Sequence, residues 1–419
     1  MNRSIATGIA AAAGLALGSA CLAQSAASTD EIRATVAEML SDAETRSSLL
    51  SAGDSGHDGK FFVAGDGYRL NIGGNTQFRY LANFRDDRAG QDDFESGFEM
   101  RYAQLHFGGT INKDWIYHVQ GNFDRDGGGF ELEDAYAGHV FSNGWVALAG
   151  QVKAPLLRET LMDNWHQLAV ESSVAEQFFG GGRTQAVALA KEAEDWSFAF
   201  AVSDGAHADN TPFTSFNGVS EADYSLTPRF QYKFAGDWKQ FKDFTSPRGS
   251  NYAAMLGGAV HWQQSRNTSS PTDTDVDVFR YTIDASIEGD GWNFFGAFYG
   301  QYVDTRSLAA DPDALNDLGG VIQGGVMVSD KAEIFARWDA IFVDEDRNFA
   351  DDNMHFVTLG MNYYFAGHAA KFTLDGVIAL NDTSSLFTPG VLPDPNATGL
   401  LGDTEEGEVV IRAQFQLMF

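Results

Sequence analysis

Polar and charged side chains occupy every second position in several stretches of this sequence and alternate there with apolar ones, a spacing that favours the passage of ions along a surface over bond-breaking chemistry. From residue 278 to 288, Arg280, Asp284 and Glu288 share one side of a period of two, whereas aromatic and aliphatic residues take the other side. Successive side chains of a β-strand point to opposite faces. Each such stretch therefore predicts a strand with one face suited to water and one suited to lipid.

Charges of both signs fall on the polar faces and in one long connection. We expect the following residues to border a water-filled lumen or its constriction: Lys153, Arg158, Glu159, Asp163, Arg79, Arg229, Arg280, Arg337, Asp284 and Asp339. Such charges can set an ion preference through electrostatic barriers, or they can only keep the lumen wet. Lys153 has two interpretations, because it can bind passing anions or anchor a loop through a salt bridge to Glu159 or Asp163.

Patterns typical of catalysis are weak. The nine His are scattered without metal-ligand spacing, and neither a serine nucleophile elbow nor a phosphate-binding loop occurs. We therefore predict that the chain is not an enzyme and uses no cofactor. The alternative is a barrel enzyme, such as a lipase with a Ser and His pair in its wall.

Acidic residues gather in the long connections. The weak candidates for Ca²⁺ or Mg²⁺ binding are Asp86, Asp87, Asp92, Asp93, Asp351 and Asp352. A dedicated calcium site needs six or more converging oxygens, so we predict no metal site. Divalent cations that bridge these loops to lipopolysaccharide are the alternative.

The first residues predict export. Arg3 precedes an apolar, Ala-rich run, and we expect a secretory signal peptide over residues 1–23. Acylation of Cys21 is the alternative. Residues 24–60 are expected to form a periplasmic tether with a short helix, for which a small coiled coil that holds an oligomer together is the second interpretation.

The composition limits the partners and the way into a membrane. A formal net charge of −30 argues against nucleic acid, because binding a polyphosphate needs a basic face. After the signal peptide no stretch of 18 apolar residues exists that could be a spanning helix. A closed β-barrel is the other fold that satisfies every backbone group in lipid.

The alternating segments predict an all-β fold, a transmembrane antiparallel barrel over residues 61–419 with sixteen strands. These lie near 69–83, 98–111, 115–124, 131–141, 145–153, 183–191, 196–203, 224–234, 252–263, 278–288, 292–303, 318–328, 332–343, 354–365, 370–380 and 407–419. Short turns alternate with long polar loops, as in bacterial outer-membrane barrels. The last segment ends on Phe419, which resembles the insertion signal of such proteins.

Several motifs in the first half of the predicted barrel support a family resemblance. They are Arg101-Tyr102-Ala103, Trp115, Asp134-Ala135-Tyr136 and, most specifically, Gly150-Gln151-Val152-Lys153-Ala154-Pro155. With these motifs, residues 98–163 resemble the amino-terminal half of the phosphate-selective porin O and P family. The resemblance implies a sixteen-stranded barrel, a homotrimer and a third loop that folds inward to narrow the pore. Residues 154–182 stand where that loop would fall.

Three functions remain open at this point. The first is an integral outer-membrane porin that lets small hydrophilic solutes and ions diffuse passively, with weak selectivity. The second is a phosphate- or anion-selective porin, although the family's selectivity depends on an arginine ladder and a lysine ring, and residues 154–182 contain no Lys cluster. The third is a structural or adhesion barrel whose loops matter more than its lumen.

Overall fold

The computed structural model describes most of the chain after residue 53. The described ranges are 54–57, 60–86, 92–123, 125, 127–211, 222–265, 274–307 and 314–419. The predicted signal peptide over residues 1–23 and the predicted helix of the tether lie outside them. Within the predicted tether and just after it, two short strands are described, β1 (Asp54–His57) and β2 (Phe61–Gly65).

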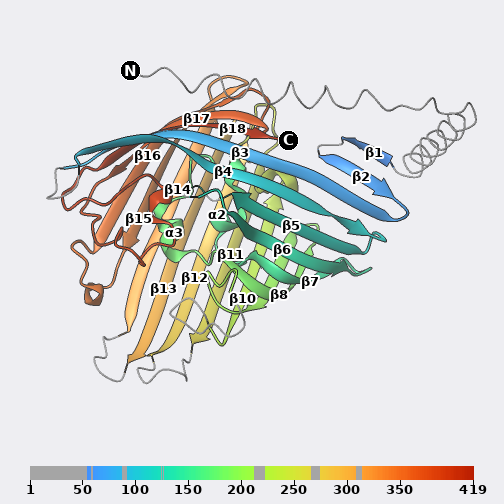
Figure 1. Cartoon of the computed structure of the whole chain (residues 1–419), viewed down its shortest axis with the longest axis horizontal. Helices are drawn as coiled ribbons and strands as arrows, with labels where there is room; N and C mark the ends of the chain where they lie inside the picture. The colour runs from blue at the N-terminus through green and yellow to red at the C-terminus, as the bar shows by residue number, and fades with distance from the viewer. Residues whose placement is uncertain are drawn as a thin grey trace, which may run out of the picture. The chain divides into compact units, whose positions relative to one another are not determined.

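Sixteen further strands of the described residues form one antiparallel sheet. They are β3 (Tyr68–Phe84), β4 (Phe94–Ile111), β5 (Trp115–Phe123), β6 (Phe130–Val140), β7 (Trp145–Lys153), β8 (Arg183–Glu192), β9 (Trp196–Ser203), β10 (Tyr224–Ala235), β11 (Ala253–Ser265), β12 (Thr274–Gly289), β13 (Trp292–Ser307), β14 (Leu315–Met327), β15 (Ala332–Phe342), β16 (Asn353–Tyr364), β17 (Ala370–Ala379) and β18 (Val409–Met418). Each pairs with the next in chain order (Figure 1).

The sheet closes on itself, because β18 pairs along its length with β3. The terminal Phe419 completes this seam, where it exchanges two 3.0 Å backbone hydrogen bonds with Gly74. The predicted sixteen-stranded transmembrane barrel is therefore confirmed. A closed sheet leaves no strand edge with unpaired backbone groups, which is the condition for a β-structure in lipid.

The two faces of the barrel wall have opposite chemistry, as the period of two predicts. In β12, Ile283 on the outside is 60% exposed, whereas its neighbour Asp284 on the inside is 1% exposed. Phe98, Phe234 and other large apolar side chains are likewise exposed on the outside. A soluble protein buries such residues, so this surface is suited to hydrocarbon.

Strands near the long loops extend further than predicted. β4 begins at Phe94 and not near residue 98, and its first residue pairs with Phe84. Likewise β12 begins at Thr274 and β13 ends at Ser307. Polar residues can continue a hairpin ladder beyond the alternating stretch, because the backbone and not the side chains makes the hydrogen bonds.

Helices are short in this fold. They include α2 (Arg158–Leu161), α3 (Val174–Phe179) and the 3₁₀ turns η1 (Asn164–His166), η2 (Trp238–Lys242), η3 (Glu345–Arg347) and η4 (Pro395–Ala397). Each helix in the described ranges is too short or too polar to cross a lipid bilayer.

The two ends of the barrel differ. One end, called here the turn end, carries the short connections and Phe419, and the other, the loop end, carries the long connections. One exception at the turn end, residues 236–252, is long. Its Phe241 and Phe244 are buried, and the Phe244 ring lies 4.8 Å from that of Phe295 on the inner wall.

Candidate functional site

The inner wall of the barrel carries an apolar patch, although the alternation of the strands predicts a polar inner face. On β13 to β16 the buried members are Phe295, Tyr299, Val321, Phe335 and Phe356. Residues 154–182 cover this patch with Leu156, Leu168, Val174 and Phe179. Burial of each such side chain contributes about 1.5–3 kcal/mol. The third loop is therefore held inside the barrel by its own apolar residues.

Gly319 on β14 shows how closely the loop fits. A Cβ atom at this position would collide with the ring of Phe179, so the glycine leaves the room that the ring occupies. The Phe179 ring also lies 5.8 Å from the ring of Tyr299. Interiors of this density respond strongly to a change of one side chain.

Wall charges hold the backbone of the same loop. Asp339 accepts hydrogen bonds from the backbone N–H of Val174 at 2.9 Å and of Ala175 at 3.2 Å. Arg337 donates to the carbonyl oxygen of Glu171 at 2.8 Å. Hydrogen bonds with one ionised partner are stronger than neutral ones, so these two residues fix the loop in place.

Most of the charged residues singled out in the sequence lie in this buried interface. Those that are at most 3% exposed are Arg79, Arg158, Glu159, Arg229, Asp284, Arg337 and Asp339. Arg229 donates both bonds of a bidentate pair to Asp284, at 2.8 and 2.9 Å. Half-buried Arg280 donates to the carbonyl oxygen of Gly180 at 2.6 Å.

Three cavities that share lining residues follow the β4 to β8 side of the barrel. The outer cavity lies near the loop end and shares Arg101 and Arg183 with the central cavity. The central cavity shares Asp163 with the inner cavity, which reaches Phe419 at the turn end. Their volumes are about 410, 220 and 510 Å³ in that order. The central cavity is the smallest, so we take it as the candidate constriction.

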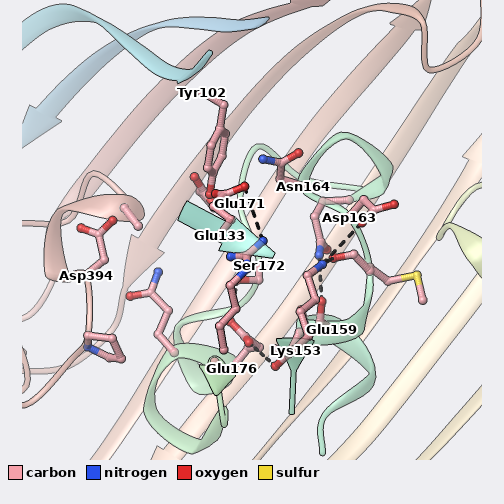
Figure 2. Close-up of a pocket in the computed structure, with 18 of the residues that line it drawn as sticks. Tyr102, Glu133, Lys153, Glu159, Asp163, Asn164, Glu171, Ser172, Glu176 and Asp394 are labelled. Carbon is pink, nitrogen blue, oxygen red and sulfur yellow. Dashed lines mark hydrogen bonds and ion pairs between the residues drawn. The ribbon is translucent and has the colours of Figure 1, made fainter. Parts of the chain in front are cut away.

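Lys153, Glu159 and Asp163 border this central cavity (Figure 2). Lys153 Nζ lies 3.5 Å from an oxygen of Asp163 and donates to the carbonyl oxygen of Met162 at 2.9 Å. Lys153 thus both faces the cavity and holds the start of the loop. The Glu159 carboxylate is occupied by hydrogen bonds from Tyr299 at 3.0 Å and Ser173 at 2.7 Å.

Two residues at the constriction, Arg101 and Glu133, come from β-bulges. In the pairing of β4 with β3, Arg101 has no partner between Met100 and Tyr102. In the pairing of β6 with β5, Glu133 is skipped in the same way. A bulge inserts one extra residue and redirects its side chain. Neither was among the residues predicted to border the pore, although the period of two puts Glu133 on a polar face.

Glu133 and its neighbour Asp134 meet Arg183 at the start of β8. Arg183 lies 3.2 Å from Asp134 and 3.5 Å from Glu133. The amide groups of Gln104 and Gln120 each donate to Glu133 at 2.6 Å. The bulge therefore presents two consecutive carboxylates to one guanidinium, which leaves a local excess of negative charge.

Two carboxyl groups of the third loop border the central cavity and differ in pKa. Burial alone would raise the pKa of Glu171, but Arg101 and Arg79 outweigh it and hold the value below the ordinary range. Burial raises the pKa of Glu176 to about 7, although hydrogen bonds from Thr160 and Ser172 oppose the rise. Glu171 is thus charged at neutral pH, whereas Glu176 changes charge there.

The described residues hold no group of three or more His, Cys, Asp or Glu side chains that could bind a metal ion. Among the weak loop candidates, Asp87 lies outside the described ranges. Asp351 accepts hydrogen bonds from Asn353 and Asn381 at 3.0 and 3.1 Å. These contacts organise the loop itself.

Comparison with known proteins addresses the motifs between β4 and β7. Residues 70–220 match the phosphate-selective porin O and P family. The resemblance seen in the sequence is therefore confirmed over this part of the chain, which includes Arg101, Glu133, Lys153 and the third loop. Among curated protein sequences, none matches this chain.

Solved structures extend the likeness to the whole barrel. The anion-selective porin of Comamonas acidovorans superposes with a TM-score of 0.58 at 10% identity, covering 84% of this chain and 99% of that one. The outer membrane channel DcaP of Acinetobacter baumannii gives 0.56 at 12% identity, covering 84% and 98%. OmpT of Vibrio cholerae gives 0.55 at 12% identity, covering 85% and 100%. At such identities the likeness shows a shared fold.

The porin family match and the closed barrel identify this chain as an integral outer-membrane β-barrel. The loop end then faces the outside of the cell and the turn end faces the periplasm, since bacterial barrels carry short turns on the periplasmic side.

Proposed function

We propose that the protein is an outer-membrane porin, a water-filled channel through which small hydrophilic solutes and ions diffuse passively with weak selectivity. The observation that carries this proposal is the row of three cavities with shared linings, which reaches from the loop end to the turn end inside the barrel. The third loop lies against one side of the wall and leaves the β4 to β8 side open.

The charges along this passage explain the weak selectivity. Cationic Arg101, Lys153 and Arg183 each lie within 3.5 Å of a carboxylate. A lining in which positive and negative side chains are paired does not lower the electrostatic barrier for cations or for anions selectively. Such a wall keeps water in the passage and admits solutes mainly by size.

The same proposal includes a homotrimer in contact with outer-membrane lipid and lipopolysaccharide, and no catalytic role. OmpT of Vibrio cholerae has been described in a trimer form. The polar groups at the constriction are used in ion pairs and loop anchors, which suits a wall better than a reaction centre. Native mass spectrometry in detergent would reveal three copies per particle, and a monomer would contradict this part.

The test is reconstitution of the protein in planar lipid bilayers. Stepwise ion conductance is expected, together with swelling of vesicles in small neutral sugars but not in large oligosaccharides. Absence of conductance steps with correctly folded protein, whose gel mobility changes on boiling, would reject the channel. A closed barrel of this kind would then favour the structural or adhesion role.

Glu176 gives a pH-dependent prediction. Its pKa of about 7 means that the carboxyl is neutral at pH 5.5 and negatively charged at pH 8.5. The ratio of potassium to chloride permeability is therefore expected to rise with pH, with a midpoint near 7. Reversal potentials under a KCl gradient measure this ratio. In Glu176→Gln the step near pH 7 should disappear, and a step of unchanged size in the variant would refute its assignment to Glu176.

A second candidate is an anion-selective porin. The matching family is described as phosphate-selective, and the similar porin of Comamonas acidovorans is described as anion-selective. The observation in its favour is the number of cationic side chains on the β4 to β8 wall. Arg79, Arg158 and Arg229, which the sequence also placed at the lumen, lie on β3, α2 and β10 and are buried against the loops. A reversal potential that shows strong chloride preference in the unmodified protein would favour this candidate.

A further inference from the structure

The last long connection, residues 380–408 between β17 and β18, also lies inside the barrel. Its Leu386, Leu392 and Leu400 are at most 3% exposed and belong to the same apolar cluster as the third loop. The backbone of Thr383 donates to Asp403 at 2.9 Å, which closes the segment on itself. Residues 380–408, here called the last loop, therefore form an ordered segment that folds into the barrel.

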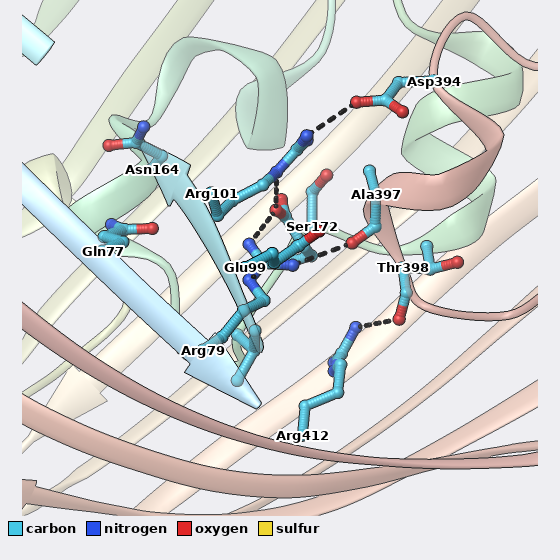
Figure 3. A network of polar contacts seen from close by, with 12 residues as sticks. Gln77, Arg79, Glu99, Arg101, Asn164, Ser172, Asp394, Ala397, Thr398 and Arg412 are labelled. Carbon is cyan, nitrogen blue, oxygen red and sulfur yellow. Dashed lines mark hydrogen bonds and ion pairs between the residues drawn. The ribbon is translucent and has the colours of Figure 1, made fainter. Parts of the chain in front are cut away.

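Three wall residues hold the backbone of the last loop, and Figure 3 shows the contacts of two of them, Arg79 and Arg412. Arg79 donates to the carbonyl oxygen of Ala397 at 3.0 Å, and Arg412 donates to that of Thr398 at 2.9 Å. Asn83 donates to the carbonyl oxygen of Gly399 at 2.9 Å. These contacts immobilise the backbone next to Asp394, so the position of that side chain is set by the wall.

Asp394 is the point where the last loop meets the passage. It borders both the outer and the central cavity, and its side chain is 38% exposed. One carboxylate oxygen accepts from Arg101 and the other from Arg125, each at 2.8 Å. Asp394 thus separates two guanidinium groups of the wall that would otherwise face the passage together.

Arg101 connects this loop to the third loop. Its Nε donates to Glu171 at 2.8 Å, and Glu171 also accepts from Arg79 at 2.6 Å. Arg79 in turn lies 3.4 Å from Glu99. The linked ionic groups are Arg79, Arg101, Arg125, Glu99, Glu171 and Asp394. Loss of Asp394 would therefore remove one negative charge that lies between Arg101 and Arg125.

The charge of Asp394 is stable. Burial alone would raise its pKa, but Arg101 and then Arg125 outweigh burial and hold the pKa below the ordinary range. The carboxylate is therefore ionised throughout the neutral range and does not act as a pH switch.

We propose that Asp394 is the residue that determines ion selectivity at the outer side of the constriction, because it cancels an arginine pair that would otherwise attract oxyanions and chloride. This inference rests on the proposed channel function and deepens it. The last loop is then a second constriction element that faces the third loop across the passage. Its contribution is one carboxylate placed between Arg101 and Arg125.

The experiment measures reversal potentials of Asp394→Asn in planar bilayers under a KCl gradient. The potassium to chloride permeability ratio is expected to fall by about threefold, the effect of roughly one unit charge near the path of the ion in a solvated pore. Inorganic phosphate added on the loop side is expected to reduce the current of the variant more than that of the unmodified protein.

Two matched variants separate this role from others. Glu406→Gln removes the same charge from an exposed position of the same loop and should leave the ratio unchanged. Asp394→Glu keeps the charge and should restore most of the ratio. An equal shift in Glu406→Gln would assign the effect to general surface charge, and an unchanged ratio in conducting Asp394→Asn channels would overturn the inference. Absence of conductance in the unmodified protein would instead reject the channel itself.

Discussion

Replacing Phe179 with Asp should raise the single-channel conductance by about twofold or more and make the current fluctuate. The ring of Phe179 is 1% exposed and fits over Gly319 on the inner wall. A carboxylate without a partner at this position costs several kcal/mol, which is comparable with the apolar contribution that holds the third loop. The loop is therefore expected to leave the wall, and single-channel recordings at fixed voltage measure the result.

Phe179→Leu is the control for this prediction. It keeps an apolar side chain at the same position against the apolar patch. Its conductance should stay near that of the unmodified protein. If Phe179→Asp channels also conduct at the original level without added noise, the apolar contact does not hold the loop in place.

The second large effect is expected at the buried pair of Asp375 and Arg412. Both side chains are fully buried, and Arg412 donates two hydrogen bonds of 2.7 Å to the Asp375 carboxylate. Removal of one partner of a buried ion pair leaves an uncompensated charge and costs about 3–5 kcal/mol. Asp375→Ala should therefore lower the free energy of unfolding by this amount, measured by urea titration of the protein folded into vesicles.

Two further variants test whether the unpaired charge is the cause. Asp330→Asn, in an exposed turn between β14 and β15, should change the stability little. The double variant Asp375→Leu with Arg412→Met replaces the pair by apolar groups, which is often neutral. If it is no more stable than Asp375→Ala, the loss comes from the other contacts of the pair, which are the hydrogen bond from the backbone N–H of Val170 to Asp375 and the one from Arg412 to Thr398.

Sequence patterns determined the strands of this protein well. The segments of period two predicted all sixteen barrel strands, and Ile283 and Asp284 lie on the faces that their alternation indicated. This succeeds because a strand between lipid and water must alternate, whatever its neighbours are. Turn lengths and the terminal Phe419 are equally local signals. Together with the strand count they indicated an outer-membrane barrel.

Only the tertiary structure decided what fills the barrel. Phe295 and Tyr299 are as apolar as the residues that face lipid, but they point into the barrel. The third loop supplies an apolar surface that covers them there. The period of two indicates that the two faces of a strand differ in polarity. It does not indicate which part of the protein or which solvent each face contacts. The same pattern did not predict Arg101 at the pore, since a bulge is set by pairing with the neighbouring strand.

The candidate constriction combines both kinds of information. Lys153 and Asp163 were expected there from their place beside the third loop, and they border the central cavity. Asp394 was not expected, because its partners Arg101 and Arg125 lie 293 and 269 residues away in the chain. The sequence by itself determined a barrel with a wetted interior. The charge pattern at the candidate constriction depends on contacts between distant segments, which exist only after the sheet has closed.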